Sequence, residues 1–388
     1  MLSIGKSTLI LALGLIAGAL LLPSAATAGL QRYQISDLTE EYGGTNQIDV
    51  PKGDRELFNK VLDGVPLAVT LKKDGKYTPE VFTVKDGSAK SWGLSDGDDT
   101  LGCPDASEVD SALVELHGYA HFVVTNVCKN TFNVRVGIRD PAEGTTTSFP
   151  LAIDGVDGGD GADVISFSKD GQAQHTVCVT SGGSLYCGQI PADAGPAPPV
   201  NMNRMDWGFA PQDDLDLAHD NDGNLHVVAT TTDGGLAYGK FPNGSNQASD
   251  SQMIGDPGQD WDFPAINVGP NGSVWVSAHS RGHGNLAIWR WNVEVGWVKS
   301  EVNPGPGDQV GMYNSMAVDP VTGIAYFTYA HSSGRTKIAQ VMPCGTIDWI
   351  WLDAALGQAY STGTWAYDGQ QKHFFLVDSV LFELAMGE

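Results

Sequence analysis

The chain has 388 residues, with 46 acidic side chains against 22 basic ones and a net charge of −24. A surface this acidic excludes duplex nucleic acid and anionic membranes as favoured partners, because both are negatively charged. The length is sufficient for one large hydrophobic core or for two smaller ones.

Residues 1–28 have the features of a secretory signal peptide. Lys6 precedes an apolar run from Leu9 to Leu22, and Ala26-Thr27-Ala28 forms a small-residue cleavage site. The run is shorter than the roughly 20 residues of a membrane-spanning helix. We therefore expect a mature chain from Gly29, without a membrane span, that is secreted in soluble form to the extracellular or periplasmic space.

Residues 29–388 repeat a pattern of strand, tight turn and strand. The clearest copies are Leu215–Val228, Pro264–Val276 and Ser315–Phe327, and their turn glycines, Gly223, Gly272 and Gly323, are 49 and 51 residues apart. A unit of this size cannot bury its apolar face alone, so the period predicts an array of small sheets.

The pattern extends to both ends of the chain. Gly369 and Gly171 mark further turns, helix signals are scarce, and 48 glycines punctuate short segments rich in β-branched and aromatic residues. We predict an all-β fold, a β-propeller of seven blades of about 50 residues. A strand at Leu30–Ile35 is expected to close the ring beside the last strand, Val380–Leu384, because an open ring would expose two sheet edges. An alternative layout has a separate β domain at residues 29–140 and a partial propeller at 141–388, with the proline-rich stretch Pro191–Pro199 as another candidate linker.

The five cysteines fit an oxidising compartment. Gly182-Gly183 suits a two-residue type I′ hairpin, and counting outward from it sets Cys178 opposite Cys187 at a position where a disulfide is sterically allowed. Cys103 and Cys128 are candidates for a second disulfide, which would leave Cys344 unpaired.

Two loops combine basic and histidine side chains. His279, Arg281 and His283 lie in one loop, His331 and Arg335 lie in the equivalent loop of the next unit, and Tyr313 precedes that unit on the same face. An arginine can neutralise the carboxylate of a uronate, a histidine can remove the adjacent proton, and a tyrosine can protonate the leaving oxygen. This group is therefore a candidate catalytic set for β-elimination. In the alternative interpretation, these side chains are solvated or end strands.

Acidic residues are expected on the same face. Asp213 and Asp262 each lie ten residues before a turn glycine, which predicts equivalent places near the central channel and makes them candidate ligand-binding residues with His279, Arg281, His331 and Arg335. Four further aspartates, separated by glycines, are candidate oxygen ligands for Ca²⁺: Asp154, Asp157, Asp160 and Asp163. A solvated acidic loop is the alternative, and no cofactor is otherwise indicated.

The segment Phe263–Val276 resembles the strand-turn-strand of secreted propellers of the BNR-repeat and sialidase-like kind, and Leu215–Val228 and Met316–Phe327 match the same outline. The resemblance covers residues 210–340 and implies a propeller fold with a glycan-facing role. A sialidase Asp box is absent, because Pro270 stands where aspartate is expected. The sequence thus leaves two hypotheses: a secreted propeller that binds a glycan or an exported protein, and a polysaccharide lyase acting on uronic-acid-containing glycans.

Overall fold

A computed structural model describes the backbone of residues 33–37, 45–49, 65–73, 76–85, 88–93, 108–117, 119–128, 131–140, 145–156, 158–169, 171–192, 199–302, 305, 307–319, 321–342, 347–351, 359–367, 370–377 and 380–386. These residues contain no helix and form seven four-stranded antiparallel sheets and one two-stranded sheet. The predicted all-β class is therefore confirmed. The expected signal peptide lies outside the described residues.

The strands follow each other along the chain, four to a sheet. The first three sheets contain β2 (Thr45–Asp49), β3 (Val65–Lys73), β4 (Lys76–Lys85) and β5 (Ser88–Gly93); β6 (Glu108–Leu116), β7 (Tyr119–Cys128), β8 (Thr131–Asp140) and β9 (Thr145–Leu151); and β11 (Gly161–Lys169), β12 (Gln172–Ser181), β13 (Ser184–Pro191) and β15 (Asn203–Arg204). A short parallel pair, β10 (Ile153–Asp154) and β14 (Val200–Asn201), lies beside the third sheet.

The remaining four sheets repeat the same order. They contain β16 (Pro211–His219), β17 (Leu225–Thr231), β18 (Leu236–Phe241) and β19 (Asp250–Gly255); β20 (Trp261–Val268), β21 (Val274–Ser280), β22 (Asn285–Asn292) and β23 (Gly296–Val302); β24 (Val310–Val318), β25 (Ala325–His331), β26 (Arg335–Val341) and β27 (Ile347–Trp351); and β28 (Ala359–Tyr367), β29 (Gln370–Val377), β30 (Val380–Met386) and β1 (Tyr33–Asp37). The three clearest sequence units coincide with β16–β17, β20–β21 and β24–β25.

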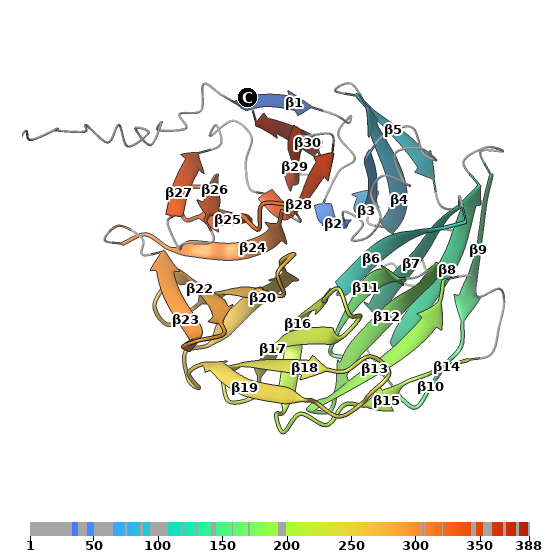
Figure 1. Cartoon of the computed structure of the whole chain (residues 1–388), viewed down its shortest axis with the longest axis horizontal. Helices are drawn as coiled ribbons and strands as arrows, with labels where there is room; N and C mark the ends of the chain where they lie inside the picture. The colour runs from blue at the N-terminus through green and yellow to red at the C-terminus, as the bar shows by residue number, and fades with distance from the viewer. Residues whose placement is uncertain are drawn as a thin grey trace, which may run out of the picture.

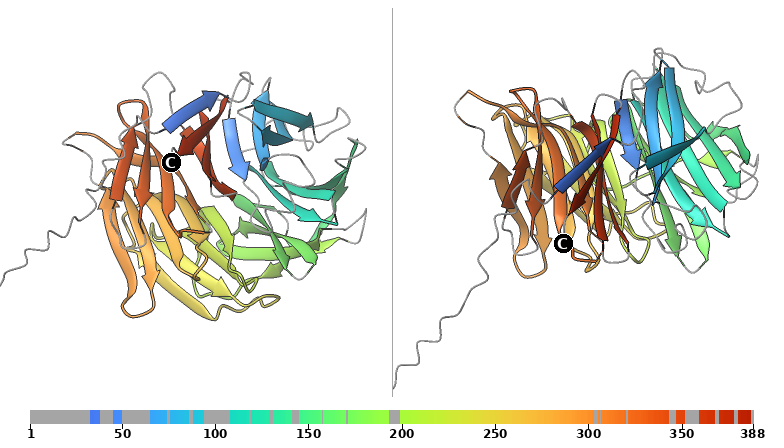
Figure 2. Two further views of the ribbon diagram at one scale, coloured as in Figure 1. Left: turned by 45° about the horizontal axis from the view of Figure 1, so that its top comes forward. Right: turned by 90° about the horizontal axis from the view of Figure 1, so that it is seen from above.

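The sheets are arranged in a ring (Figures 1 and 2). The first strand of each sheet lies nearest the centre and contacts the first strands of both neighbouring sheets, from β2 round to β28 and back to β2. The outer strand of the last sheet is β1, which pairs antiparallel with β30 from Tyr33 opposite Met386 to Asp37 opposite Phe382. An N-terminal strand thus occupies the place expected from the sequence, although its bounds are shifted from Leu30–Ile35.

The hydrophobic core is divided into layers between successive sheets. Second strands are enclosed on both faces, so β17, β21 and β25 are buried along their whole length. The outer strand β23 is mostly half-buried or exposed. One layer packs Leu215 and Val227 of the fourth sheet against Ile165 of the third, and another packs Trp275 and Leu286 of the fifth against Phe327 of the sixth. Each sheet therefore depends on its neighbours for burial, as the repeat predicts.

The turn chemistry read from the sequence is confirmed in detail. Gly223, Gly272 and Gly323 have φ values of 79°, 71° and 70°, which glycine adopts without steric cost. In the β12–β13 hairpin Ser181 pairs with Ser184, and Cys178 pairs with Cys187 in a disulfide with a Cα–Cα distance of 4.2 Å. Cys103, the side chain of Cys128, and Cys344 lie outside the described residues.

Aspartates on three successive first strands connect the sheets near the centre. Asp110 accepts hydrogen bonds from the N–H groups of Ser111 and of Val164 in the next sheet, at 2.7 and 2.9 Å. Asp216 likewise accepts from Leu217 and from Ile266 in its next sheet, at 2.8 and 2.6 Å. Asp163 lies between these two carboxyl groups in the ring.

Candidate functional site

One face of the ring is formed by the hairpins that join second and third strands, together with the segments that lead into first strands; we call it the hairpin face. Backbone hydrogen bonds connect these hairpins in sequence around the ring: Gly258 N–H to Asp233 O, Gly282 N–H to Gln259 O, Val310 N–H to Gly284 O and Ser332 N–H to Gln309 O. Loops held this way by a rigid scaffold are common positions for binding residues. The hairpin face contains most of the residues singled out from the sequence.

Asp262 is the centre of a buried polar group in the fifth sheet. Its Oδ1 lies 2.6 Å from Nδ1 of His279, the residue opposite it in the ladder, and its Oδ2 accepts a 2.5 Å hydrogen bond from Nε of Arg281. Only 3% of the His279 side chain is exposed and its Nε2 has no hydrogen-bond partner, whereas the Arg281 side chain is 66% exposed. The hydrogen bond that Arg281 donates to Asp262 raises the pKa of Arg281. Asp262 therefore neutralises Arg281 and holds His279 inside the sheet.

Two further carboxyl groups lie beside Asp262 on β16. Burial, together with the charges of Asp213 and Asp262, raises the pKa of Asp214 to about 6, although the N–H of Phe263 and the charge of Arg281 oppose the shift. Asp213 is exposed. Three carboxyl groups and one guanidinium thus meet where β16 and β20 begin, and the structure brings the predicted residues Asp213, Asp262, His279 and Arg281 together.

A cavity of about 350 Å³ opens next to Asp213 on the hairpin face. It is lined by Val127, Gly159, Asp160, Gly183, Pro211, Gln212, Asp213 and Thr232. Asp160 is exposed and accepts a 3.2 Å hydrogen bond from the N–H of Gly182. A Cβ at Gly161 would lie 1.6 Å from the carbonyl oxygen of Asp213, so glycine is required for the two first strands to approach each other here. Asp160 and Asp213 give the cavity a negative wall.

Two aromatic residues with strained backbones lie next to the acidic group. Phe263 and Tyr313 have φ values of 49° and 50°, uncommon for bulky side chains, and each lies two residues before the ladder resumes after a bulge. Their ring centroids are 4.6 Å apart. Asn314 holds this arrangement by donating a 2.5 Å hydrogen bond to the carbonyl of Phe263, and Tyr313 remains 39% exposed. The sequence predicts Tyr313 as a site residue but not Phe263 or Asp214, because the bulges that place them leave no sequence signal.

The other predicted loop residues belong to the next hairpin. His331 is buried, with Nδ1 2.8 Å from Oγ of Ser333 and Nε2 3.8 Å from a carboxyl oxygen of Asp308. Arg335 is the exposed ladder partner of His331. His283 is exposed at the tip of the preceding hairpin, where its N–H is bonded to Oγ of Ser280. His331 and Ser332 thus form a polar group around Asp308, one sheet away from Asp262.

The expected equivalence of Asp213 and Asp262 is corrected by the ladder. Asp262 pairs with His279 before the bulge of β20, whereas Asp213 lies within the bulge of β16, between Pro211 and Leu215. In register, Asp213 corresponds to Phe263. Counting back from a turn glycine failed because the two bulges differ in length, and a bulge shifts every residue beyond it.

The calcium prediction finds no support in the described part of the chain. Those residues include no group of three or more His, Cys, Asp or Glu side chains that could hold a metal ion. Asp154 is exposed in β10, Asp160 faces the small cavity, and Asp163 is buried in β11, while Asp157 lies outside the described residues.

Comparisons with known proteins identify the fold. No family model matches the chain, and no curated protein matches it. Among solved structures, it is similar to the β-propeller domain of Cps50 (Swd1) from Myceliophteria thermophila, with a TM-score of 0.56, 10% identity, and coverage of 91% of this chain and 99% of that one. It is also similar to the Dos1 propeller, with a TM-score of 0.51, 11% identity, and coverage of 83% and 76%. The chain is therefore a β-propeller, and at this level of identity the likeness concerns the fold alone. The described residues include no helix long and apolar enough to cross a membrane.

Proposed function

We propose that this chain is an exported, non-catalytic binding propeller whose hairpin face binds a basic segment of an exported protein. The observation that carries the proposal is the excess of carboxyl groups at the centre of that face. Asp213, Asp214 and Asp262 surround the single guanidinium of Arg281, and Asp160 adds a fourth carboxylate across the small cavity. A lysine or arginine side chain is the complementary ligand, because it would offset the mutual repulsion of these groups.

Aromatic surface beside the carboxylates supports the same ligand. The exposed ring of Tyr313, packed on Phe263, offers a face on which a cationic side chain can lie. The net charge of −24 would also steer a basic partner toward the molecule and accelerate its association at low salt.

The contacts of Asp262 do not favour the elimination alternative. Elimination from a uronate needs an arginine available to the substrate carboxylate and a histidine that can reach the proton. Arg281 is already paired with Asp262, and His279 is buried with Nδ1 bonded to the same carboxylate. An acidic polymer would also meet the carboxyl groups of this face. A screen of uronic-acid polysaccharides for new absorbance from unsaturated products tests this alternative directly.

Titration with charged peptides tests the binding proposal. We would compare the affinities of lysine- and arginine-containing peptides with those of matched glutamate peptides, at low and at physiological salt. We expect the basic peptides alone to bind, Asp160→Asn/Asp213→Asn to weaken binding severalfold, and added salt to do the same. Glu294→Gln is the control, since it removes a charge from an exposed turn on the opposite face. Equal binding by the control and the double variant, or no preference for basic peptides, would contradict the proposal.

A further inference from the structure

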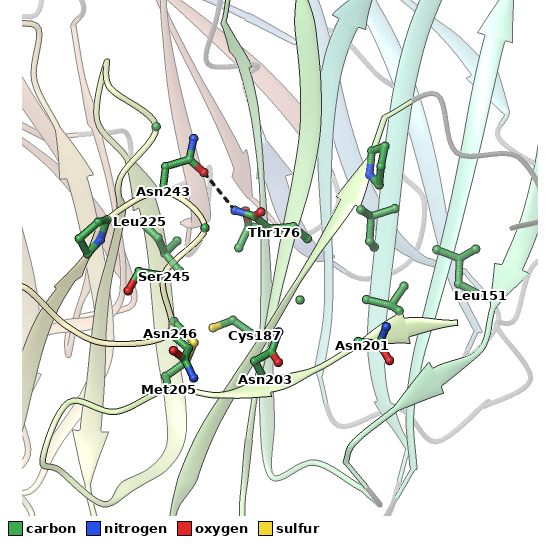
Figure 3. Close-up of a pocket in the computed structure, with 18 of the residues that line it drawn as sticks. Leu151, Thr176, Cys187, Asn201, Asn203, Met205, Leu225, Asn243, Ser245 and Asn246 are labelled. Carbon is green, nitrogen blue, oxygen red and sulfur yellow. Dashed lines mark hydrogen bonds between the residues drawn. The ribbon is translucent and has the colours of Figure 1, made fainter. Parts of the chain in front are cut away.

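A second and larger cavity lies on the face opposite the hairpins, between the third and fourth sheets (Figure 3). Its volume is about 690 Å³, within the range of small-ligand sites. One wall is formed by the outer part of the third sheet, from Cys187 to Pro191, and by the adjacent segment from Pro199 to Asn203. The other wall is the β18–β19 turn, from Pro242 to Asn246. It shares no lining residue with the acidic cavity of the hairpin face.

The cavity is lined by amides and apolar groups. Five carboxamide side chains line it: Gln189, Asn201, Asn203, Asn243 and Asn246. Thr176 and Ser245 add hydroxyl groups, and the buried side chains of Ile190, Met205 and Leu225 supply apolar surface. None of the described lining residues is charged, although 18% of the whole chain is. The uncharged lining therefore disfavours an ionic ligand.

Each carboxamide both donates and accepts hydrogen bonds, and so does each hydroxyl group of a sugar. A lining that combines carboxamides with apolar side chains therefore complements a saccharide, which presents hydroxyl groups at its edge and C–H groups on its faces. A charged ligand would lose hydration here without gaining a charged partner. An acidic ligand would also be repelled by the net charge of the protein.

The walls of the cavity are held in place before any ligand arrives. Nε2 of Gln189 donates a 3.3 Å hydrogen bond to Oδ1 of Asn243 across the space between the walls. The carbonyl of Asn246 accepts a 2.7 Å hydrogen bond from the N–H of Asp206. On the third sheet, the disulfide ties Cys187 of β13 to Cys178 of β12. Rigid polar groups lose little entropy on binding, which favours affinity for a small ligand.

Two chain segments of this same wall approach each other closely at Gly188. A Cβ at Gly188 would lie 2.7 Å from a methyl group of Val200, so glycine allows the chain leading to Asn201 to cross directly over β13. An extended peptide is a poorer fit for this space. Strand addition needs a continuous free edge, and β15 already pairs with Tyr186 and Cys187 of β13.

We infer that the cavity between the third and fourth sheets binds a neutral saccharide of one or two sugar units. Figure 3 shows the juxtaposition that carries this inference, with Asn243, Ser245 and Asn246 on one side and Asn201 on the other. The inference is independent of the proposed protein partner, because the two cavities lie on opposite faces.

Calorimetric titration of the full mature chain tests the inference. The probes are a panel of neutral mono- and disaccharides that includes glucose, galactose, N-acetylglucosamine, maltose, cellobiose and lactose, together with glucuronate and a neutral tetrapeptide. We expect at least one neutral sugar to bind and glucuronate and the tetrapeptide to bind at least tenfold more weakly. Failure of every neutral sugar, or equal binding by glucuronate or the tetrapeptide, would overturn the inference.

Two variants locate the binding. Asn201→Ala/Asn243→Ala should lower the affinity for the sugar at least tenfold. Ser245 lies on the turn that forms one wall, and Ser245→Trp should abolish binding because the larger side chain fills the cavity. Asn271→Ala is the matched control, because Asn271 is an exposed turn residue that does not line the cavity. An unchanged melting temperature shows that each variant is folded. Binding unaffected by Ser245→Trp would place the sugar elsewhere and refute the assignment.

Discussion

Replacing Asp163 by asparagine should stabilise this propeller, and the gain should grow with pH. Asp163 is buried in β11, and burial together with Asp110 and Asp216 raises its pKa well above the usual 3.8. Its Oδ1 accepts a 2.7 Å hydrogen bond from the N–H of Val164, but no N–H or O–H group of the described residues donates to Oδ2. The neighbouring carboxylates of Asp110 and Asp216 can only accept hydrogen bonds. A proton held by Asp163 therefore supplies the donor that these three carboxyl groups otherwise lack.

The magnitude follows from linkage between protonation and folding. A group whose pKa is raised in the folded state contributes its full stability below the unfolded value, near pH 4, and that stability is lost as pH rises toward the folded value. The loss is about 1.4 kcal/mol for each pH unit in that window. Asparagine keeps the oxygen for Val164 and supplies an N–H donor to Asp110 or Asp216 at every pH. The difference in unfolding free energy between variant and wild type should therefore rise by about 1.4 kcal/mol for each pH unit in the same window.

Urea unfolding of the wild-type and Asp163→Asn proteins, both produced without residues 1–28, at pH 4, 5, 6, 7 and 8 measures this difference. We expect little difference at pH 4 and a clear advantage for the variant at pH 7. Glu294→Gln controls for the loss of one negative charge, because Glu294 is exposed. Parallel stability curves for Asp163→Asn and wild type would refute the reasoning, since they would mean that Asp163 is ionised in the folded protein.

Four further predictions concern other contacts. Asp214→Asn should also stabilise with rising pH, but its gain should level off near pH 6, the raised pKa of Asp214, in the same urea series. Asp220 accepts hydrogen bonds from Asn224, His226 and Lys240, which lower its pKa although burial opposes the shift, so its contribution to stability is complete above pH 4 and declines gradually as pH falls below 4. Asp220→Ala should cost about 2–4 kcal/mol at pH 7 and less at pH 2, and an equal cost at both pH values would contradict this. Reduction of the Cys178–Cys187 disulfide should cost about 2–3 kcal/mol in calorimetry of the wild type and nothing in the Cys178→Ser/Cys187→Ser variant. Deletion of residues 29–37 removes β1 from the edge of β30 and should lower the melting temperature sharply; an unchanged value would show that this pairing does not support the ring.

The sequence by itself determined the repeated unit and its local chemistry. Turn glycines such as Gly223 and Gly272 need a positive φ, and the apolar segments around them alternate as strands do, so both signals act within a few residues. The pairing of Cys178 with Cys187 followed from the two-residue turn alone, because a tight hairpin fixes its own register. Local rules of this kind do not depend on the neighbouring sheets.

Only the tertiary structure decided which side chains meet. Asp213 and Asp262 looked equivalent by counting, but bulges of different length placed Asp213 beside a cavity and Asp262 between His279 and Arg281. Asp163 looked like a calcium ligand in an acidic loop, yet its surroundings are set by first strands from two other sheets, about 50 residues away on each side. Bulge length, burial and contacts between sheets arise when separate sheets pack together, and no short stretch of sequence encodes them.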